Sequence, residues 1–213
     1  MNVPMLRSRP RQFAAATALL ALAAAATAFS APSGQQAPWL ADLKGEHRQL
    51  FDTPTPNGGV PLVHIMNYYD TYNTAFAVKD NAVNGVLTFY GGTTLFGLSD
   101  AMWAKYQLGA FLGEKDAAGS PFVANPWRST PTIMGMSLPQ ASIESLQKRG
   151  ATLIICNNAL TVFSGLVAKS RGLDAQAVYA DMKANILPKV TLVPAMVIAI
   201  EQAHTAGLSY HRQ

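Results

Sequence analysis

Gly150-Ala-Thr-Leu-Ile-Ile-Cys-Asn-Asn-Ala-Leu160 is the stretch that decides the fold of this chain. Residues 152–155 are apolar or β-branched and follow a glycine that stops a helix, which predicts a central strand of a parallel sheet, buried on both faces. The residues after Cys156 continue as a helical apolar pattern. We therefore expect the chain's single cysteine at the carboxyl end of a strand, beside the first turn of a helix.

That position has chemical consequences for Cys156. The first turn of a helix carries unpaired N–H groups and the positive end of the helix dipole, and both favour a negatively charged sulfur. We expect the N–H groups of Asn158 and Ala159 to donate to the sulfur, and the side chains of Asn157 and Asn158 to donate to a sulfur or an oxyanion. The alternatives are that Cys156 is a small buried hydrophobe and that the asparagines form a helix cap and turn.

The rest of the chain predicts an alternation of strands and helices. Strands are expected at residues 60–66, 83–90, 190–193 and 208–211, with helices between them and residues 44–51 forming a short helix or extended arm. Such alternation is typical of a mostly parallel sheet covered by helices on both faces. The fold class is therefore a three-layer α/β/α sandwich with a mostly parallel five-stranded sheet.

Candidate binding residues follow the expected strands. Gly91 and Gly92 come directly after residues 83–90, where paired glycines let backbone N–H groups approach a ligand, although a plain tight turn explains them equally well. Asn67 follows the strand expected at 60–66, so it is predicted to lie near Cys156. The histidines lack the spacing of a zinc site, and we expect neither a metal nor a cofactor.

The first thirty residues have the layout of a secretory signal peptide. Arg7, Arg9 and Arg11 precede an uncharged Ala- and Leu-rich run that ends in small residues. The run is too short and too weakly apolar for a stable membrane anchor. We therefore expect residues 1–30 to be a cleaved leader, 31–58 a linker or arm, 59–213 a single domain, and the mature protein periplasmic or secreted.

The charge of the mature chain excludes a nucleic-acid partner. The whole chain has 16 Lys and Arg against 12 Asp and Glu, a net charge of +4. Removing the three leader arginines leaves 13 against 12, close to neutral. A basic footprint of the kind that binds phosphate backbones is therefore missing from the predicted mature part.

Two stretches resemble a known family. Residues 150–160 resemble the Gly-hydrophobic-Cys-x-Asn segment of DsrE/DsrF-like proteins, particularly their exported branch, and residues 187–210 resemble the tail of that family. Lys189 and Met196 stand where the family often has glycine. The resemblance implies a trimer or hexamer, and a cysteine at the position of Cys156 that carries sulfur as a persulfide.

Two functions follow from these expectations. The first is an exported, sulfurtransferase-like sulfur carrier in which Cys156 exchanges sulfane sulfur with a sulfur-donor or acceptor protein or a small sulfur compound. The second is a non-catalytic module that binds a small ligand or forms oligomers, with Gly91, Gly92, Asn157 and Asn158 around the ligand. A homo-oligomer is expected in either case, with Tyr and Trp residues of segment 90–128 buried between subunits. Segment 113–139 is expected to be a lid, binding loop or oligomer contact.

Overall fold

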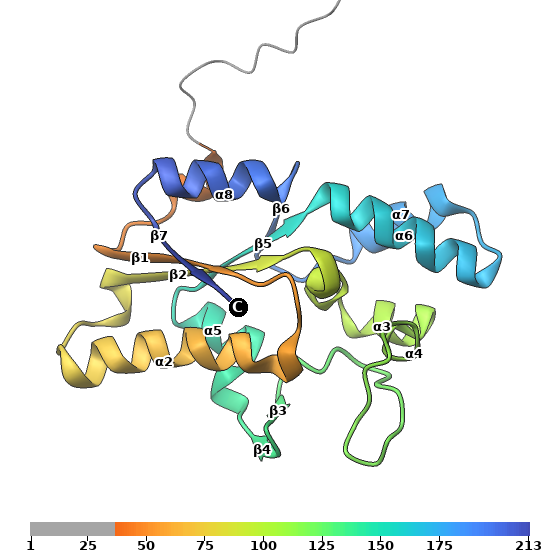
Figure 1. Ribbon diagram of the computed structural model, residues 1–213, viewed down its shortest axis with the longest axis horizontal. Helices are drawn as coiled ribbons and strands as arrows, with labels where there is room; N and C mark the ends of the chain where they lie inside the picture. Colours follow the sequence, from red (N-terminus) through yellow and green to blue (C-terminus); the bar gives the residue numbers. More distant parts are fainter. Residues whose placement is uncertain (1–36) are drawn as a thin grey trace, which may run out of the picture. The chain divides into compact units, whose positions relative to one another are not determined.

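The computed structural model describes residues 37–213, so the predicted leader lies outside the described part of the chain. A five-stranded sheet forms its centre, in the order β6-β5-β2-β1-β7 (Figure 1). Every neighbouring pair in this sheet is parallel. The strands are β1 (His47–Asp52), β2 (Val83–Phe89), β5 (Thr152–Cys156), β6 (Val190–Val193) and β7 (Ser209–Arg212). The predicted α/β sandwich with a parallel five-stranded sheet is confirmed.

Helices cover both faces of the sheet. In Figure 1, α2 (Val60–Ala75) and α5 (Ile143–Lys148) lie on one side of the strands and α8 (Met196–Thr205) lies on the other. Alternate strand residues supply two separate cores, because successive side chains point to opposite faces. Phe51, Leu87 and Ile155 belong to the larger core on the α2 face. Leu50, Ile154 and Cys156 belong to the smaller core, together with α8 and α1 (Pro38–Ala41).

The strand predicted at residues 60–66 is wrong, because this segment begins helix α2. Its buried residues recur at the three- and four-residue spacing of a helix: Leu62, Ile65, Met66 and Tyr69. Pro61 lies in the first turn of this helix. A proline is tolerated there because N–H groups of the first turn have no hydrogen-bond partner within the helix. The first strand is instead β1, which pairs with β2 on one side and β7 on the other. The domain therefore begins earlier than residue 59, and residues 47–52 are not a linker or arm.

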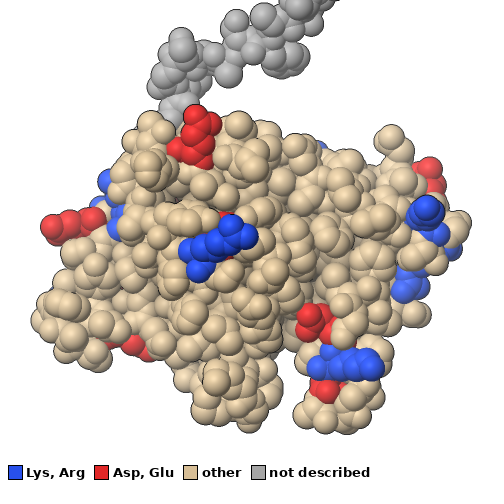
Figure 2. All heavy atoms as spheres, viewed as in Figure 1, with Lys and Arg blue, Asp and Glu red and all other residues tan. Residues whose placement is uncertain are grey.

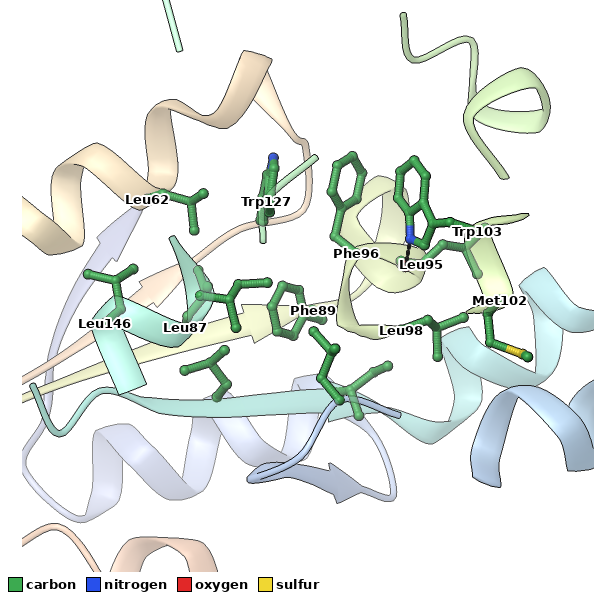
Figure 3. Packing of buried hydrophobic residues seen from close by; sticks show 14 of the residues in the cluster. Leu62, Leu87, Phe89, Leu95, Phe96, Leu98, Met102, Trp103, Trp127 and Leu146 are labelled. Atoms are coloured by element: carbon green, nitrogen blue, oxygen red, sulfur yellow. Dashed lines mark hydrogen bonds between the residues drawn. The ribbon is translucent and has the colours of Figure 1, made fainter. Parts of the chain in front are cut away.

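The segment between α3 (Asp100–Tyr106) and α5 packs onto the larger core. It includes α4 (Leu108–Leu112) and a small antiparallel hairpin of β3 (Thr132–Ile133) and β4 (Met136–Ser137). Trp127 lies against Phe96 and Phe89, and Trp103 donates its indole N–H to the Leu95 carbonyl at 3.0 Å (Figure 3). Trp103, Tyr106 and Trp127 are buried within the chain itself. The expectation that these aromatic residues fill a subunit interface is therefore wrong.

An arginine at the end of α5 ties three elements together. The Arg149 guanidinium binds Asp80 at 2.9 Å and Asp70 at 2.5 Å and lies over the Tyr69 ring. Burial acts to raise the pKa of Asp80, but the hydrogen bonds from Arg149 and Asn73 and the charge of Arg149 outweigh it, so this pKa lies below the ordinary value of an aspartate. Arg149 therefore holds α5, α2 and the segment before β2 in place through a charge-dependent contact.

This contact predicts a pH dependence of stability. A carboxyl whose pKa is lower in the folded state stabilises the fold fully above its unfolded-state pKa, and this contribution is lost as the pH falls through the folded value. We expect wild-type stability to decline as the pH drops below about 4, with a shallower decline in Arg149→Met. Urea unfolding between pH 2.5 and 7 measures the difference. Equal slopes in the two proteins would contradict the assignment to Arg149.

Candidate functional site

Cys156 lies where two helix N-termini meet. It is the last residue of β5 and the N-cap of α6 (Asn157–Arg171), and its side chain is 5% exposed. Its Sγ accepts hydrogen bonds from the N–H of Ala159 at 3.4 Å and the N–H of Met196 at 3.3 Å. Ala159 lies in the first turn of α6 and Met196 is the first residue of α8. Both helix dipoles therefore present their positive ends to one sulfur.

The second donor differs from the expectation. The predicted donation from Ala159 is present, but the N–H of Asn158 donates to the Pro194 carbonyl at 3.3 Å. The N–H of Met196 is the second donor to the sulfur instead of the N–H of Asn158. It reaches the sulfur because β6 pairs with β5 in a register that sets Val193 opposite Cys156. The turn after β6 then carries the start of α8 to the sulfur.

The two asparagines after Cys156 have other contacts. The Asn157 Oδ1 accepts a hydrogen bond from the Tyr179 hydroxyl at 2.6 Å, which joins α6 to α7 (Ala175–Ala184). Asn158 is exposed. No hydrogen bond joins either side chain to Cys156 in the described part of the chain, so their contacts fit a helix start better than a sulfur-binding role.

Gly91 and Gly92 begin the 3₁₀ segment after β2 and pack on the loop that follows β1. Gly91 has a φ of +56°, and a Cβ added there would lie 3.0 Å from the Pro54 carbonyl oxygen. The N–H of Gly92 donates to the same oxygen at 2.8 Å. This close backbone contact explains both glycines as a tight turn, without a ligand.

Asn67 does not join the group around Cys156. It is an exposed residue of α2, which packs on the larger core, whereas Cys156 belongs to the smaller core on the other face of the sheet. The expectation of proximity is wrong because it depended on a strand at residues 60–66.

Sequence reasoning missed a buried acid on the Cys156 face. Asp52 ends β1 and is 2% exposed, and its carboxylate accepts hydrogen bonds from the hydroxyls of Tyr90, at 2.6 Å, and Tyr210. Burial, together with hydrogen bonding to Asp52 and the charge of Asp52, raises the pKa of Tyr90 and of Tyr210 above the usual value of a phenol. Both phenols therefore stay protonated and remain donors at neutral pH.

The sheet register brings this group toward the cysteine. Phe89 pairs with Ile155, so the next positions on the two strands are Tyr90 and Cys156, on the same face. Tyr90 also packs against the smaller core that contains Cys156. An acidic residue ending a strand is a signal that would have indicated Asp52, had residues 47–52 been recognised as a strand.

Comparisons with family models, with curated proteins and with solved structures found no match for this chain. Within residues 37–213, no group of three or more His, Cys, Asp or Glu side chains is placed to hold a metal ion. None of the helices in the same range is long and apolar enough to cross a membrane. The geometry around Cys156 is therefore the main guide to chemistry.

Proposed function

We propose that this protein is an exported DsrE-like sulfur-handling protein in which Cys156 carries sulfane sulfur as a persulfide. The observation that carries the proposal is the pair of backbone N–H donors on Sγ, one from each of two helix N-termini. Two such donors and two helix dipoles stabilise negative charge on the sulfur, and a thiolate is the nucleophile that sulfur transfer requires.

The proposed step is a displacement at sulfur. With thiosulfate as the donor, the Cys156 thiolate attacks the outer sulfur and a new S–S bond forms at Sγ. The bond between the two thiosulfate sulfurs breaks, and its electron pair leaves with sulfite. The thiol proton passes to solvent, the persulfide keeps one negative charge, and no external oxidant is needed.

A second function has its own support. Cys156 is nearly buried and belongs to an apolar core, which is the usual environment of an inert structural cysteine. In this alternative the protein is a binding or oligomer-forming module. Exposed apolar side chains on α6 and α8 favour an assembly with further copies of the chain: Val162, Leu166, Val197 and Ile198.

Export and assembly are parts of the same proposal and have direct tests. N-terminal sequencing of the native protein is expected to find a start near residue 29 or 31, and a start at Met1 would contradict export.

Light scattering is expected to give an oligomer, and a monomer at micromolar concentration would contradict assembly.

The proposed chemistry predicts a sulfur adduct on one residue. After incubation with thiosulfate or polysulfide, the folded protein is expected to gain about 32 Da, one sulfur atom, on Cys156. Intact-mass and peptide mass spectrometry measure the gain, and Cys156→Ser, which changes one atom, is expected to show none.

The control separates the two functions. The same incubation is repeated in urea, where the protein is unfolded and the Cys156 thiol is accessible to the sulfur donor. A thiol that is inert in the folded protein and gains sulfur only in urea would make Cys156 a packing residue, and the module function would replace sulfur transfer.

A further inference from the structure

A groove lined by aromatic rings runs between α2 and the β1–β7 edge of the sheet, on the face opposite Cys156. Its volume is about 430 Å³, within the range of small-molecule sites. The rings that line it are those of Phe51, His64, Tyr68, Tyr72, Phe76 and His211. Nothing in the proposed function uses this groove.

Helix geometry explains why the rings form one wall. His64, Tyr68 and Tyr72 of α2 and its C-cap residue Phe76 follow each other at four-residue spacing and therefore lie along one side of the helix. The opposite wall is the sheet, where Phe51 and His211 are paired residues of β1 and β7. The two walls touch where the Tyr68 ring meets the Phe51 ring edge-on, with centroids 5.5 Å apart.

One end of the groove is held by contacts between the walls. The His64 and His211 rings stack with centroids 5.5 Å apart, and the His64 Nδ1 is hydrogen-bonded to the Gln213 Oε1 at 2.5 Å. The Nε2 of Gln213 is buried and has no partner among the described residues. A spare hydrogen-bond donor therefore lies beside the His64 end of the groove.

The other end remains open. Tyr72 stacks on His47 with centroids 4.2 Å apart, and Phe76 is tilted against Tyr72. The Phe76 side chain is 66% exposed. A large apolar ring left in water beside other rings is costly, and covering it with a ligand ring recovers that burial.

The polar groups of the groove carry no permanent charge. Gln49, Asn67 and Thr71 supply amides and a hydroxyl, and no described residue that lines the groove is Asp, Glu, Lys or Arg. Burial, with the neighbouring Tyr72 and Tyr69, raises the pKa of Tyr68, which therefore stays an uncharged phenol. Charged side chains are also few and scattered over the face drawn in Figure 2. The described lining residues therefore offer no carboxylate, ammonium or guanidinium group to a charged ligand.

We propose that this groove binds a small uncharged ligand with a planar aromatic or heteroaromatic ring. The ligand ring packs against the Tyr72 and Phe76 rings at the open end of the groove, and one or two polar substituents bond to the amides and the hydroxyl. A saccharide of the same size needs partners for many hydroxyl groups, and the groove offers only a few. The proposal is independent of sulfur transfer by Cys156.

Binding of 2-naphthol to the full chain at pH 7.5 tests the proposal. Saturation-transfer NMR and titration calorimetry are expected to detect it with a Kd below about 1 mM. Naphthalene-2-sulfonate, which has the same rings and a negative charge, is expected to bind at least about tenfold more weakly because no Lys or Arg side chain lines the groove to pair with its charge. Maltotriose is expected not to bind.

Three variants locate the site. Phe76→Ala removes an exposed ring and is expected to weaken 2-naphthol binding about three- to tenfold, while Phe76→Tyr keeps the ring and the affinity. Leu173→Ala removes an exposed apolar side chain between α6 and α7 and is expected to change nothing. Circular dichroism checks that each variant is folded.

Several results would overturn the proposal. They are the absence of 2-naphthol binding, equal or tighter binding of the sulfonate, preferential binding of maltotriose, and an unchanged affinity in Phe76→Ala. Equal losses in Phe76→Ala and Leu173→Ala would show unspecific adsorption to apolar surface and would also overturn it.

Discussion

Replacing Trp103 with Ala is expected to lower the free energy of unfolding by about 3–5 kcal/mol. The Trp103 side chain has no exposed surface, packs edge-on against Phe96 and donates its indole N–H to the Leu95 carbonyl. Its removal leaves a cavity in the larger core and takes one of two donors from the Leu95 carbonyl, which keeps the hydrogen bond from the Leu98 N–H. Urea unfolding followed by far-UV circular dichroism measures the loss.

One further variant separates the loss of packing from the loss of the hydrogen bond, and a second variant is a control. Trp103→Phe keeps most of the apolar volume but loses the hydrogen bond, so a smaller loss of about 1–3 kcal/mol is expected. Val123→Ala, at a side chain that is 75% exposed, is the control. Its expected change stays within about 0.5 kcal/mol. A loss in Trp103→Ala no larger than in Val123→Ala would refute the assigned packing.

The second large effect is expected at the buried carboxylate of Asp52. The double variant Tyr90→Phe with Tyr210→Phe removes both hydroxyl donors and is expected to lose about 2–4 kcal/mol of unfolding free energy. Most of this loss is assigned to Tyr90. Tyr210 is 47% exposed, so water reaches its surroundings more easily and can replace part of its hydrogen bond. The two single variants, measured by urea unfolding, give this division.

A matched control and a rescue complete this test. Tyr179→Phe removes a phenol hydroxyl whose acceptor is the neutral amide of Asn157. A smaller loss of about 0.5–1.5 kcal/mol is expected there. Adding Asp52→Val to the double variant removes the unpaired carboxylate and is expected to restore at least about 1 kcal/mol. If the third substitution destabilises the protein further, the loss does not come from an unpaired carboxylate.

Segments with a strong local signal were predicted closely. The strand expected at 190–193 coincides with β6, and the strand expected at 152–155 differs from β5 by one residue. Helix α6 ends at Arg171, and Gly172 follows with a φ of +63°, as the glycine stop signal predicts. Apolar runs, glycine stops and aspartate caps are local features, so the sequence alone reveals them.

The first strand and the first long helix were exchanged because their signals conflict locally. Residues 60–66 contain valines and an isoleucine, which favour strands, whereas β1 begins with the polar residues His47, Arg48 and Gln49. β1 is a strand because two parallel neighbours pair with it, and segment 60–75 is a helix because its spaced apolar residues pack on β2 and the sheet beneath. Pairing across the sheet overrides strand propensity here.

The sequence alone determined the class of the fold and the position of Cys156 at a strand end beside a helix start, because both depend on residues a few positions apart. Tertiary structure decided the rest of the site. The Met196 N–H reaches the sulfur across 40 positions, and Tyr210 reaches Asp52 across 158. The aromatic groove likewise joins α2 to β1 and β7. Such contacts depend on the order of the strands in the sheet and on the face that each helix covers. Local patterns of residues predict neither the strand order nor the placement of the helices.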